Sequence, residues 1–264
     1  MTIIDLEQPR FSGMPIFPDH QPGYSYFLHR RHRDTLKSQP GSLGRSSSSG
    51  VLVMMEHSGT HVDAICHQAE DLKFYGCHDA DDYESVNGFS MGDATAIPVF
   101  HHPGVLIDLV RDNDGAEVSA SALISLEQVQ RAAKKQNAVP APGEVALIRT
   151  GNGRYWNDSE RYLNGPGMSP DVSQWLADLG VVAVGADNMA WDLQGYVDPK
   201  VNCDLPGHVI LLVRSGIHIF ENVNLERLGD AGVGRFTFFA APLQLRGATG
   251  SPIRPIAVLE GGDQ

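Results

Sequence analysis

Short apolar runs, most of them bounded by Gly, Pro, Asn or Ser, dominate the chain from about residue 100 onward. Runs of roughly four to eight apolar residues between such turn-forming residues are typical of buried strands. The pattern therefore predicts strands over 104–109, 144–149, 181–187, 217–220, 235–245 and 253–260.

Two segments between these strands carry helical periodicity instead. The first, 119–136, has Ser119 or Ser121 as its expected N-cap. The second, 170–179, begins with a proline directly after a serine and ends before a glycine, an arrangement that favours helix ends. Strands outnumber helices, their alternation is irregular, and no linker interrupts it. We therefore expect a single α/β domain with a mixed sheet over residues 1–264.

The amino-terminal part of the chain is less regular. Residues 1–49 are rich in Pro, Gly, Ser, His and aromatic residues, so we expect irregular structure with short strands that contributes to a binding pocket. The apolar run 51–56 predicts a buried strand. Residues 70–95 are acidic and rich in turn-forming residues, which predicts an excursion at the surface.

Three histidines and a carboxylate follow the strand predicted at 51–56. His57, His61, Asp63 and His67 all occupy odd positions, so their side chains would point to one face of an extended chain. In an α-helix, at roughly 100° per residue, Asp63 would point about 160° away from His61. The four side chains converge only if the segment is strand-like, and a glycine after the first histidine can absorb a bend.

Imidazole and carboxylate groups in this arrangement indicate a divalent metal site. The donors are nitrogen and oxygen without an obligatory thiolate, which suits Zn²⁺ or Mn²⁺. The pattern is not the HExxH motif of metalloproteases, because Ser58 stands where that motif has its glutamate. His208 and Glu221 have the chemistry to join the site, but their spacing leaves open whether they do.

Two other candidates for catalysis are weaker. Residues 88–92 match the G-x-S-x-G nucleophile motif, but they lack the buried strand before it and the helix after it. Cys66 is even-numbered within the extended segment and so faces away from the histidines, which favours a packed core residue over a nucleophile.

The charge and the cysteine content limit the partners and the compartment. With 20 Lys and Arg against 32 Asp and Glu, the formal net charge is −12, which disfavours nucleic acid and anionic membrane surfaces. The three cysteines form no CxxC pair, no secretory signal is visible, and no apolar run approaches the ~20 residues of a membrane span. We therefore expect a soluble cytoplasmic protein that acts on a small molecule.

The run 57–67 resembles the H-x-G-T-H-x-D-x-P-x-H motif of the metal-dependent cyclase superfamily, which includes kynurenine formamidases and isatin hydrolases. Further similarity is seen in 149–156, 184–188 and 216–222, so the resemblance covers most of the chain after about residue 50. Ile65 departs from the motif, where many members have proline. The form Asp-Ala-Ile-Cys-His looks closer to the isatin hydrolases than to the formamidases.

This resemblance implies a swivelling β/β/α-type fold and a homo-oligomer, commonly a dimer or tetramer. It implies that a metal is held by three residues, His57, His61 and Asp63. It assigns the catalytic acid and base role to His67. In relatives with two metals, the second is held by a histidine and a glutamate that match His208 and Glu221.

Residue chemistry and resemblance together predict a hydrolase that uses a metal and His67 to open an amide, with the cyclic amide isatin as the leading substrate. Aromatic residues are expected to wall a pocket for a flat ring: Phe17, Tyr24, Tyr26, Phe27 and Trp191. One alternative is the opening of an arylformamide or a lactone on the same fold. The other is a non-catalytic protein in which the metal only stabilises the fold.

Overall fold

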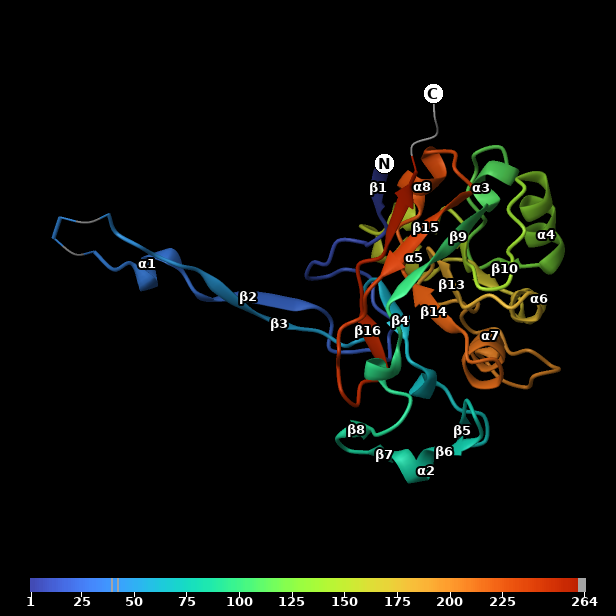
Figure 1. Ribbon diagram of the computed structural model, residues 1–264, viewed down its shortest axis with the longest axis horizontal. Coiled ribbons are helices and arrows are strands. Elements are labelled where there is room, and N and C mark those ends of the chain that lie inside the picture. Colours follow the sequence, from blue (N-terminus) through green and yellow to red (C-terminus); the bar gives the residue numbers. More distant parts are fainter. Residues whose placement is uncertain (39, 42, 261–264) are drawn as a thin grey trace.

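A nine-stranded mixed β-sheet forms the centre of the computed structural model, which describes residues 1–38, 40–41 and 43–260 (Figure 1). The strand order is β1-β17-β15-β9-β11-β13-β14-β4-β16. Four central strands are parallel: β9 (Phe100–Asp108), β11 (Val145–Arg149), β13 (Ala183–Ala186) and β14 (His218–Glu221). Antiparallel strands complete both edges: β15 (Arg235–Ala240), β17 (Ile256–Leu259), β1 (Thr2–Asp5), and, at the opposite edge, β4 (His61–Asp63) and β16 (Gly250–Pro252).

Side chains alternate across the central strands and pack into two cores. Leu106 and Leu147 belong to one core, whereas their neighbours Ile107 and Ile148 belong to the other. This period of two is what strands buried on both faces require. The mixed α/β architecture expected from the sequence is confirmed.

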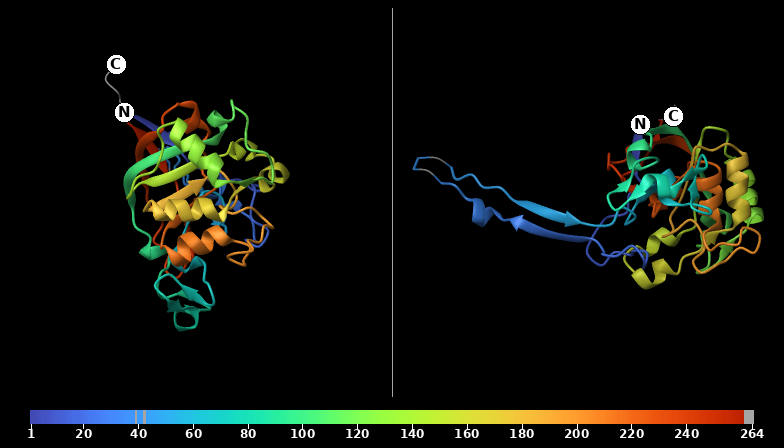
Figure 2. Two further views of the ribbon diagram at one scale, coloured as in Figure 1. Left: turned by 90° about the vertical axis from the view of Figure 1, so that its right-hand side faces the viewer. Right: turned by 90° about the horizontal axis from the view of Figure 1, so that it is seen from below.

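Three helical elements cover one face of the sheet, and the left view of Figure 2 shows them stacked one below another: α4 (Leu126–Lys135), α6 (Pro170–Asp178) and the π-helical η4 (Val209–Arg214). The opposite core is closed by side chains of the outer strands, because the sheet curls: Ile4, Val62, Phe238 and Ala257. Within the described ranges, no helix is long and apolar enough to cross a membrane.

The six strands predicted after residue 100 are all found, with shifted ends. The largest difference is at 235–245, where β15 ends at Ala240. The helix predicted at 170–179 is α6, which starts with Pro170 directly after a serine, as expected.

The other predicted helix starts later than expected, so the N-caps proposed at Ser119 and Ser121 are wrong. Ser125 caps α4 instead: its hydroxyl accepts the backbone N–H of Gln128, and the Gln128 side chain accepts the N–H of Ser125. The residues before it form the short strand β10 (Leu123–Ile124), which pairs with β12 (Gly167–Met168).

Residues 70–95 form a small lobe at the bottom of Figure 1, which confirms the predicted surface excursion. Its elements are β5 (Lys73–Phe74), β6 (His78–Asp79), α2 (Ala80–Tyr83), β7 (Glu84–Ser85), β8 (Gly88–Phe89) and η2 (Ala94–Ala96). Ser90 of the G-x-S-x-G sequence lies exposed in this lobe and donates to the carbonyl of Tyr83 at 3.2 Å. This position is not the strand-to-helix turn that a nucleophile motif needs.

Short elements connect the remaining strands: η1 (Ile65–His67), α3 (Leu109–Asp112), η3 (Asn152–Tyr155), α5 (Ser159–Leu163), α7 (Pro206–His208) and α8 (Glu226–Asp230).

A long two-stranded arm projects from the body of the molecule (Figures 1 and 2). It consists of β2 (Ser25–Arg30), β3 (Ser49–Val53), the helical turn α1 (His32–Thr35) and the described residues between them. The strand predicted at 51–56 therefore exists in part as β3, but every residue of β3 is exposed. The expectation that this strand is buried is wrong, because it pairs only with β2.

Candidate metal centre

Strand β4 presents two of the expected ligands near one edge of the sheet. His61 and Asp63 share one face of the strand, and Val62 between them packs into the core. In the sheet register, His61 lies opposite Glu221 of β14, and Asp63 lies opposite Gly250 of β16. The register therefore brings Glu221 to the His–Asp pair, although the two strands are far apart in the sequence.

His57 reaches the same place through a turn. Gly59 in this turn has φ of +67°, in the left-handed region that favours glycine. The ring of His57 lies so close to the backbone of β16 that a Cβ on Gly250 would collide with it. The extended conformation predicted for the whole segment holds only for 61–63, and His67 follows in a 3₁₀ turn.

His57, His61 and Asp63 form a first cluster of buried donor atoms, which lie within 4.8 Å of one another. Nδ1 of His57 lies 3.0 Å, and Nε2 of His61 3.4 Å, from Oδ1 of Asp63. These atoms have no hydrogen-bond partner among the described residues. Buried polar atoms without partners are costly, and one shared cation would satisfy all three. The donor set therefore fits a divalent metal.

Hydrogen bonds on the far side of each ring fix which nitrogen faces the cluster. Nδ1 of His61 donates to the carbonyl of Gly59 at 2.8 Å. Nε2 of His57 donates to the hydroxyl of Thr249 at 2.8 Å, and that hydroxyl donates to Glu56 at 3.1 Å. Outer partners of this kind hold a ligating histidine in one tautomer and orientation. Sequence reasoning missed Glu56 and Thr249, which lie 193 positions apart in the chain.

Asp63, His208 and Glu221 form a second cluster, so Asp63 belongs to both. Oδ2 of Asp63 lies 3.7 Å from Nε2 of His208, which in turn lies 3.2 Å from Oε1 of Glu221. The other oxygen of Glu221 lies 3.4 Å from Nε2 of His61. The structure thus brings together His208 and Glu221, which their spacing had left open. Two carboxylates shared between two groups of histidines fit a pair of neighbouring cations.

Asp192 holds His208 in place. Its Oδ2 accepts Nδ1–H of His208 at 2.7 Å and the backbone N–H of the same residue at 3.0 Å. Its other oxygen accepts the backbone N–H of Gly207 at 2.7 Å. These bonds point Nε2 of His208 into the centre. Sequence reasoning missed Asp192, because only the fold brings it to the start of α7.

The carboxylates set the charge of the centre. Burial and the neighbouring Asp63 would raise the pKa of Glu221, but contacts with His208 and His61 lower it to about 2. Burial would also raise the pKa of Asp63, yet the surrounding histidines hold it well below its usual range. Burial would lower the pKa of His61, but the two carboxylates raise it to about 10. A divalent cation would take the place of the proton that the two carboxylates stabilise on His61.

His67 lies beside the first cluster and belongs to neither group of donor atoms. Its ring stacks on that of His57 with 3.9 Å between the centroids. Burial and, next, the neighbouring His57 lower the pKa of His67 to about 3, so the ring is neutral at physiological pH. A neutral imidazole in this position can accept a proton.

A line of rings leads from the amino-terminal segment to the centre. Phe17 lies 5.1 Å from His20, and His20 lies 5.1 Å from His57 and 6.4 Å from His67, measured between ring centroids. Nδ1 of His20 is buried and has no hydrogen-bond partner among the described residues. The sequence predicted Phe17 near the site but missed His20, which has no spacing that relates it to the other histidines.

The other expected pocket residues are spread over three regions of the structure. Trp191 is fully buried in the helix-side core, where its indole N–H donates to Ser173 at 2.9 Å. Its expected role as a pocket wall is therefore corrected, although its backbone N–H donates to Glu221 at 2.8 Å. Tyr26 and Phe27 lie exposed on the arm. Tyr24 and Phe17 both pack against a small cluster formed by Met14, Trp156, Tyr162 and Met189.

Cys66 packs into the core, as the sequence indicated. Burial, followed by the charge of Asp93, raises the pKa of its thiol to about 12. A thiol of this kind stays protonated and is a poor nucleophile.

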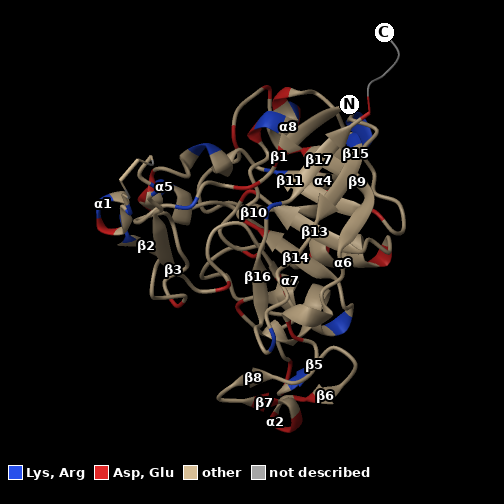
Figure 3. Ribbon diagram, turned by 60° about the vertical axis from the view of Figure 1, so that its left-hand side comes forward, with Lys and Arg blue, Asp and Glu red and all other residues tan. Residues whose placement is uncertain are grey.

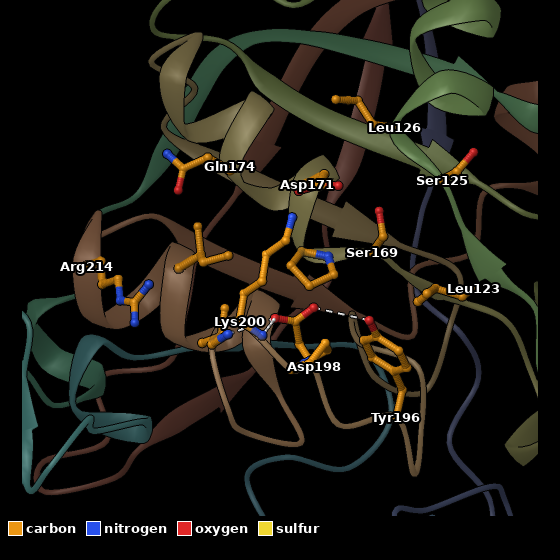
Figure 4. Close-up of a pocket in the computed structure, with 14 residues that line it drawn as sticks. Leu123, Ser125, Leu126, Ser169, Asp171, Gln174, Tyr196, Asp198, Lys200 and Arg214 are labelled. Atoms are coloured by element: carbon orange, nitrogen blue, oxygen red, sulfur yellow. Dashed lines mark hydrogen bonds between the residues drawn. The ribbon is translucent and has the colours of Figure 1, made fainter.

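A cavity of about 480 Å³ lies away from these ligands, against the start of α6 (Figure 4). The segment that follows the sheet strand β13 closes it: Asp198 accepts the hydroxyl of Tyr196 at 3.1 Å and the backbone N–H of Lys200 at 2.9 Å. Neither metal cluster contributes a residue to its wall.

Three comparisons relate the chain to known proteins. The family model Cyclase, described as "Putative cyclase", matches residues 4–193. Kynurenine formamidase from Bacillus cytotoxicus (strain DSM 22905 / CIP 110041 / 391-98 / NVH 391-98) is 29% identical over 256 residues, which cover 96% of this chain and 95% of that protein.

Two solved structures share the fold. A crystal structure of a novel cyclase superposes with a TM-score of 0.84 at 26% identity and covers 98% of this chain and 88% of its own. Isatin hydrolase A from Ralstonia solanacearum superposes with a TM-score of 0.70 at 21% identity. The superposition covers 98% of this chain and 92% of that chain.

Proposed function

This chain belongs to the cyclase family, and we propose that it is a metal-dependent hydrolase of an amide bond attached to an aromatic ring. One observation carries the proposal. The unpartnered nitrogen atoms of His57 and His61 both face Oδ1 of Asp63, whose two oxygens are also unpartnered, at the junction of two donor clusters. A fold-stabilising site needs one closed set of ligands, whereas shared carboxylates with room for water are typical of hydrolytic centres.

A divalent metal, Zn²⁺ or Mn²⁺, would supply an acidified water molecule and polarise the amide carbonyl. The chain would hold it through His57, His61 and Asp63 and, for a second ion, through Asp63, His208 and Glu221. The outer bonds from Gly59, Thr249 and Asp192 keep the imidazoles oriented before substrate arrives.

His67 is the proposed acid and base. Its ring is neutral, stacks on His57 and is not needed as a ligand. It accepts a proton from the attacking water and donates it to the leaving nitrogen. The C–N bond breaks in the process: the carbonyl carbon keeps the hydroxyl group from water, and the leaving nitrogen takes the hydrogen.

The line of rings formed by Phe17, His20, His57 and His67 supports an aromatic substrate. Flat side chains at these separations favour stacking with a planar group. The unpartnered Nδ1 of His20 is available to a carbonyl or amine next to that ring.

We favour an arylformamide such as N-formylkynurenine as the first candidate, because the second donor cluster is complete and the formamidase relatives align over nearly the whole chain. The cyclic amide isatin is the second candidate. The observation that favours it is Ile65, at the position where many members of the family have proline.

A substrate panel tests this proposal. Purified protein is stripped with a chelator and assayed with N-formylkynurenine, isatin and an enol lactone, with and without added Mn²⁺ or Zn²⁺. We expect metal-dependent hydrolysis, with the highest kcat/KM for N-formylkynurenine. A higher value for isatin selects the second candidate. Hydrolysis that persists undiminished in stripped protein contradicts the proposal.

A further inference from the structure

The cavity beside the start of α6 contains a buried hydroxyl group that the fold leaves without a partner. Ser169 directly precedes α6 and lines the cavity, and Figure 4 shows its hydroxyl among the lining side chains, between Asp171 and Ser125. A serine at this position often caps its helix, but the side chain of Ser169 accepts no backbone N–H. The residue is 8% exposed, and its Oγ has no hydrogen-bond partner among the described residues. Such a hydroxyl is costly, so a polar group bound in the cavity would stabilise it.

A free cation also lies in the wall of the cavity. The side chain of Lys200 extends toward the start of α6 in Figure 4, and it makes no hydrogen bond or ion pair with the part of the chain that the structure describes. Arg214, the other cation of the wall, is paired at 3.0 Å with Glu70 of the small lobe, and Figure 3 shows further acidic residues of this lobe around α2. The amino-terminal end of α6 adds partial positive charge, so a negatively charged group is favoured between Lys200 and Ser169.

A free carboxylate lies beside this position. Asp171 is exposed, lines the cavity and makes no side-chain hydrogen bond or ion pair within the described ranges. Asp198, the other acid of the wall, is buried and accepts the hydroxyl of Tyr196 at 3.1 Å. It also accepts the backbone N–H groups of Lys200 and Val201 at 2.9 and 2.7 Å. A simple anion would be repelled by Asp171 and a simple cation by Lys200, whereas a zwitterion matches both charges.

The rest of the wall suits an apolar group. The cavity measures about 480 Å³, which is enough for a small molecule. Apolar side chains from several separate parts of the chain line it: Leu123, Leu126, Pro170, Val201 and Ile210. A ligand with an apolar side chain would remove these groups from water.

We propose that this cavity binds a free α-amino acid with a large apolar side chain. The carboxylate of the amino acid accepts the hydroxyl of Ser169 and pairs with Lys200, next to the start of α6. Its ammonium group pairs with Asp171, and its side chain packs against the apolar wall. Each charged group of the ligand thereby meets a partner that the fold leaves free. Neither donor cluster of the metal centre takes part, so the proposal does not depend on the proposed reaction.

Isothermal titration calorimetry of the metal-loaded protein with L-phenylalanine tests the binding. We expect a dissociation constant of about 1 mM or lower. Two matched probes each lack one charge: 3-phenylpropanoate has no ammonium group, and 2-phenylethylamine has no carboxylate. Both should bind at least about tenfold more weakly than phenylalanine. Absence of phenylalanine binding overturns the proposal, and so does equally tight binding of either probe.

Substitutions in the wall identify the groups that hold the ligand. Lys200→Met and Asp171→Asn each remove one charge from an exposed residue, and each should raise the dissociation constant for phenylalanine at least about tenfold. Lys134→Met on α4 and Asp82→Asn on α2 are the matched controls, because both residues are exposed and neither lines the cavity. Their affinity for phenylalanine should equal that of the wild type. Unchanged affinity in the Lys200 or the Asp171 variant contradicts the proposal.

Ser169→Ala tests the role of the buried hydroxyl. The variant should bind phenylalanine about threefold to tenfold more weakly, because one hydrogen bond to the carboxylate is lost. Its melting temperature without ligand should be the same or higher, since the hydroxyl has no partner among the described residues. A lower melting temperature with unchanged affinity would show that the hydroxyl stabilises the fold instead, and would contradict its assignment to the ligand.

Hydrogen exchange locates the ligand without any substitution. Phenylalanine should slow the exchange of backbone amides in residues 196–201, which form one wall of the cavity, and at the start of α6. Residues 80–95 of the small lobe do not line the cavity and should exchange at an unchanged rate. Slower exchange in residues 57–67, with none at the cavity, would place the amino acid at the metal centre and overturn the proposal.

Discussion

The metal centre and the arm depart from ordinary burial in opposite directions. At the metal centre, polar and ionisable side chains are buried: His57, His61, Asp63, His208 and Glu221. Along the arm, aromatic and aliphatic side chains of β2 and β3 are about half exposed. Burying unpaired charge is costly, and exposing a contiguous apolar surface is rare in a monomer. Each departure therefore indicates something that the single chain lacks.

The two regions differ in how firmly the fold determines them. Each histidine of the two donor clusters is oriented by a hydrogen bond from its other ring nitrogen, to Thr249 for His57 and to Asp192 for His208. The arm has only its own cross-strand pairing. We therefore expect the metal centre to be the more rigid of the two regions.

The largest effect is expected for His61→Ala, which removes a ligand that faces both carboxylates. Loss of the metal removes several kcal/mol of transition-state stabilisation, or about a thousandfold in kcat/KM. Metal content, measured by elemental analysis, should fall together with activity. Full activity in a variant that no longer holds metal would exclude this mechanism.

His67→Ala is expected to separate metal binding from turnover. Loss of a general acid and base costs roughly 10² to 10⁴ in kcat, while the ligand atoms remain in place. Elemental analysis should show unchanged metal content. His101→Ala on β9, an exposed histidine, is the control and should retain activity. Loss of metal from the His67 variant would mean that this residue is a ligand.

Thr249→Val tests whether the hydrogen bonds behind the histidine rings orient these rings for metal binding. The substitution keeps the shape of the side chain but removes the hydroxyl that links His57 to Glu56. Metal affinity should fall about tenfold to a hundredfold, as measured by competition with a chelator. Thr237→Val on β15 is the matched control and should leave metal affinity unchanged. Equal affinity in both variants would show that the Thr249 contact does not orient the ligand.

The smallest effect concerns the arm. If a partner covers it, the melting temperature should rise with protein concentration, by roughly 2 °C for each tenfold increase, because association stabilises only the folded state. The variant with Phe27→Ser and Leu52→Ser should lose this dependence. A wild-type melting temperature that is independent of concentration would argue that the arm makes no contact with a second chain.

The sequence predicted the central strands and the first ligand cluster because both depend on local pattern. Apolar runs mark β9, β11 and β13, and the spacing of His61 and Asp63 follows from strand geometry. The position of His57 in this cluster was also expected, but not the conformation that produces it, since a turn at Gly59 brings its ring there.

Features that depend on contacts between distant segments could not be predicted in this way. The approach of Glu221 to His61 depends on the register of β4 and β14, and Asp192 reaches His208 only through the fold. The run 209–213 is apolar throughout, a pattern that does not distinguish a strand from the buried helix η4 that the structure contains. The apolar run of β3 suggested burial, because sequence alone does not show whether a strand faces its own core or another chain.

The proposed mechanism requires both donor clusters to hold metal, with Asp63 shared between them. The most direct measurement is the number of metal atoms per chain in purified wild type and in His208→Ala, determined by elemental analysis after loading with Mn²⁺ or Zn²⁺. We expect two metal atoms per chain in the wild type and one in the variant. Wild-type protein that retains no metal after loading would contradict this mechanism. Equal metal content in both proteins would show that the second cluster does not bind a metal.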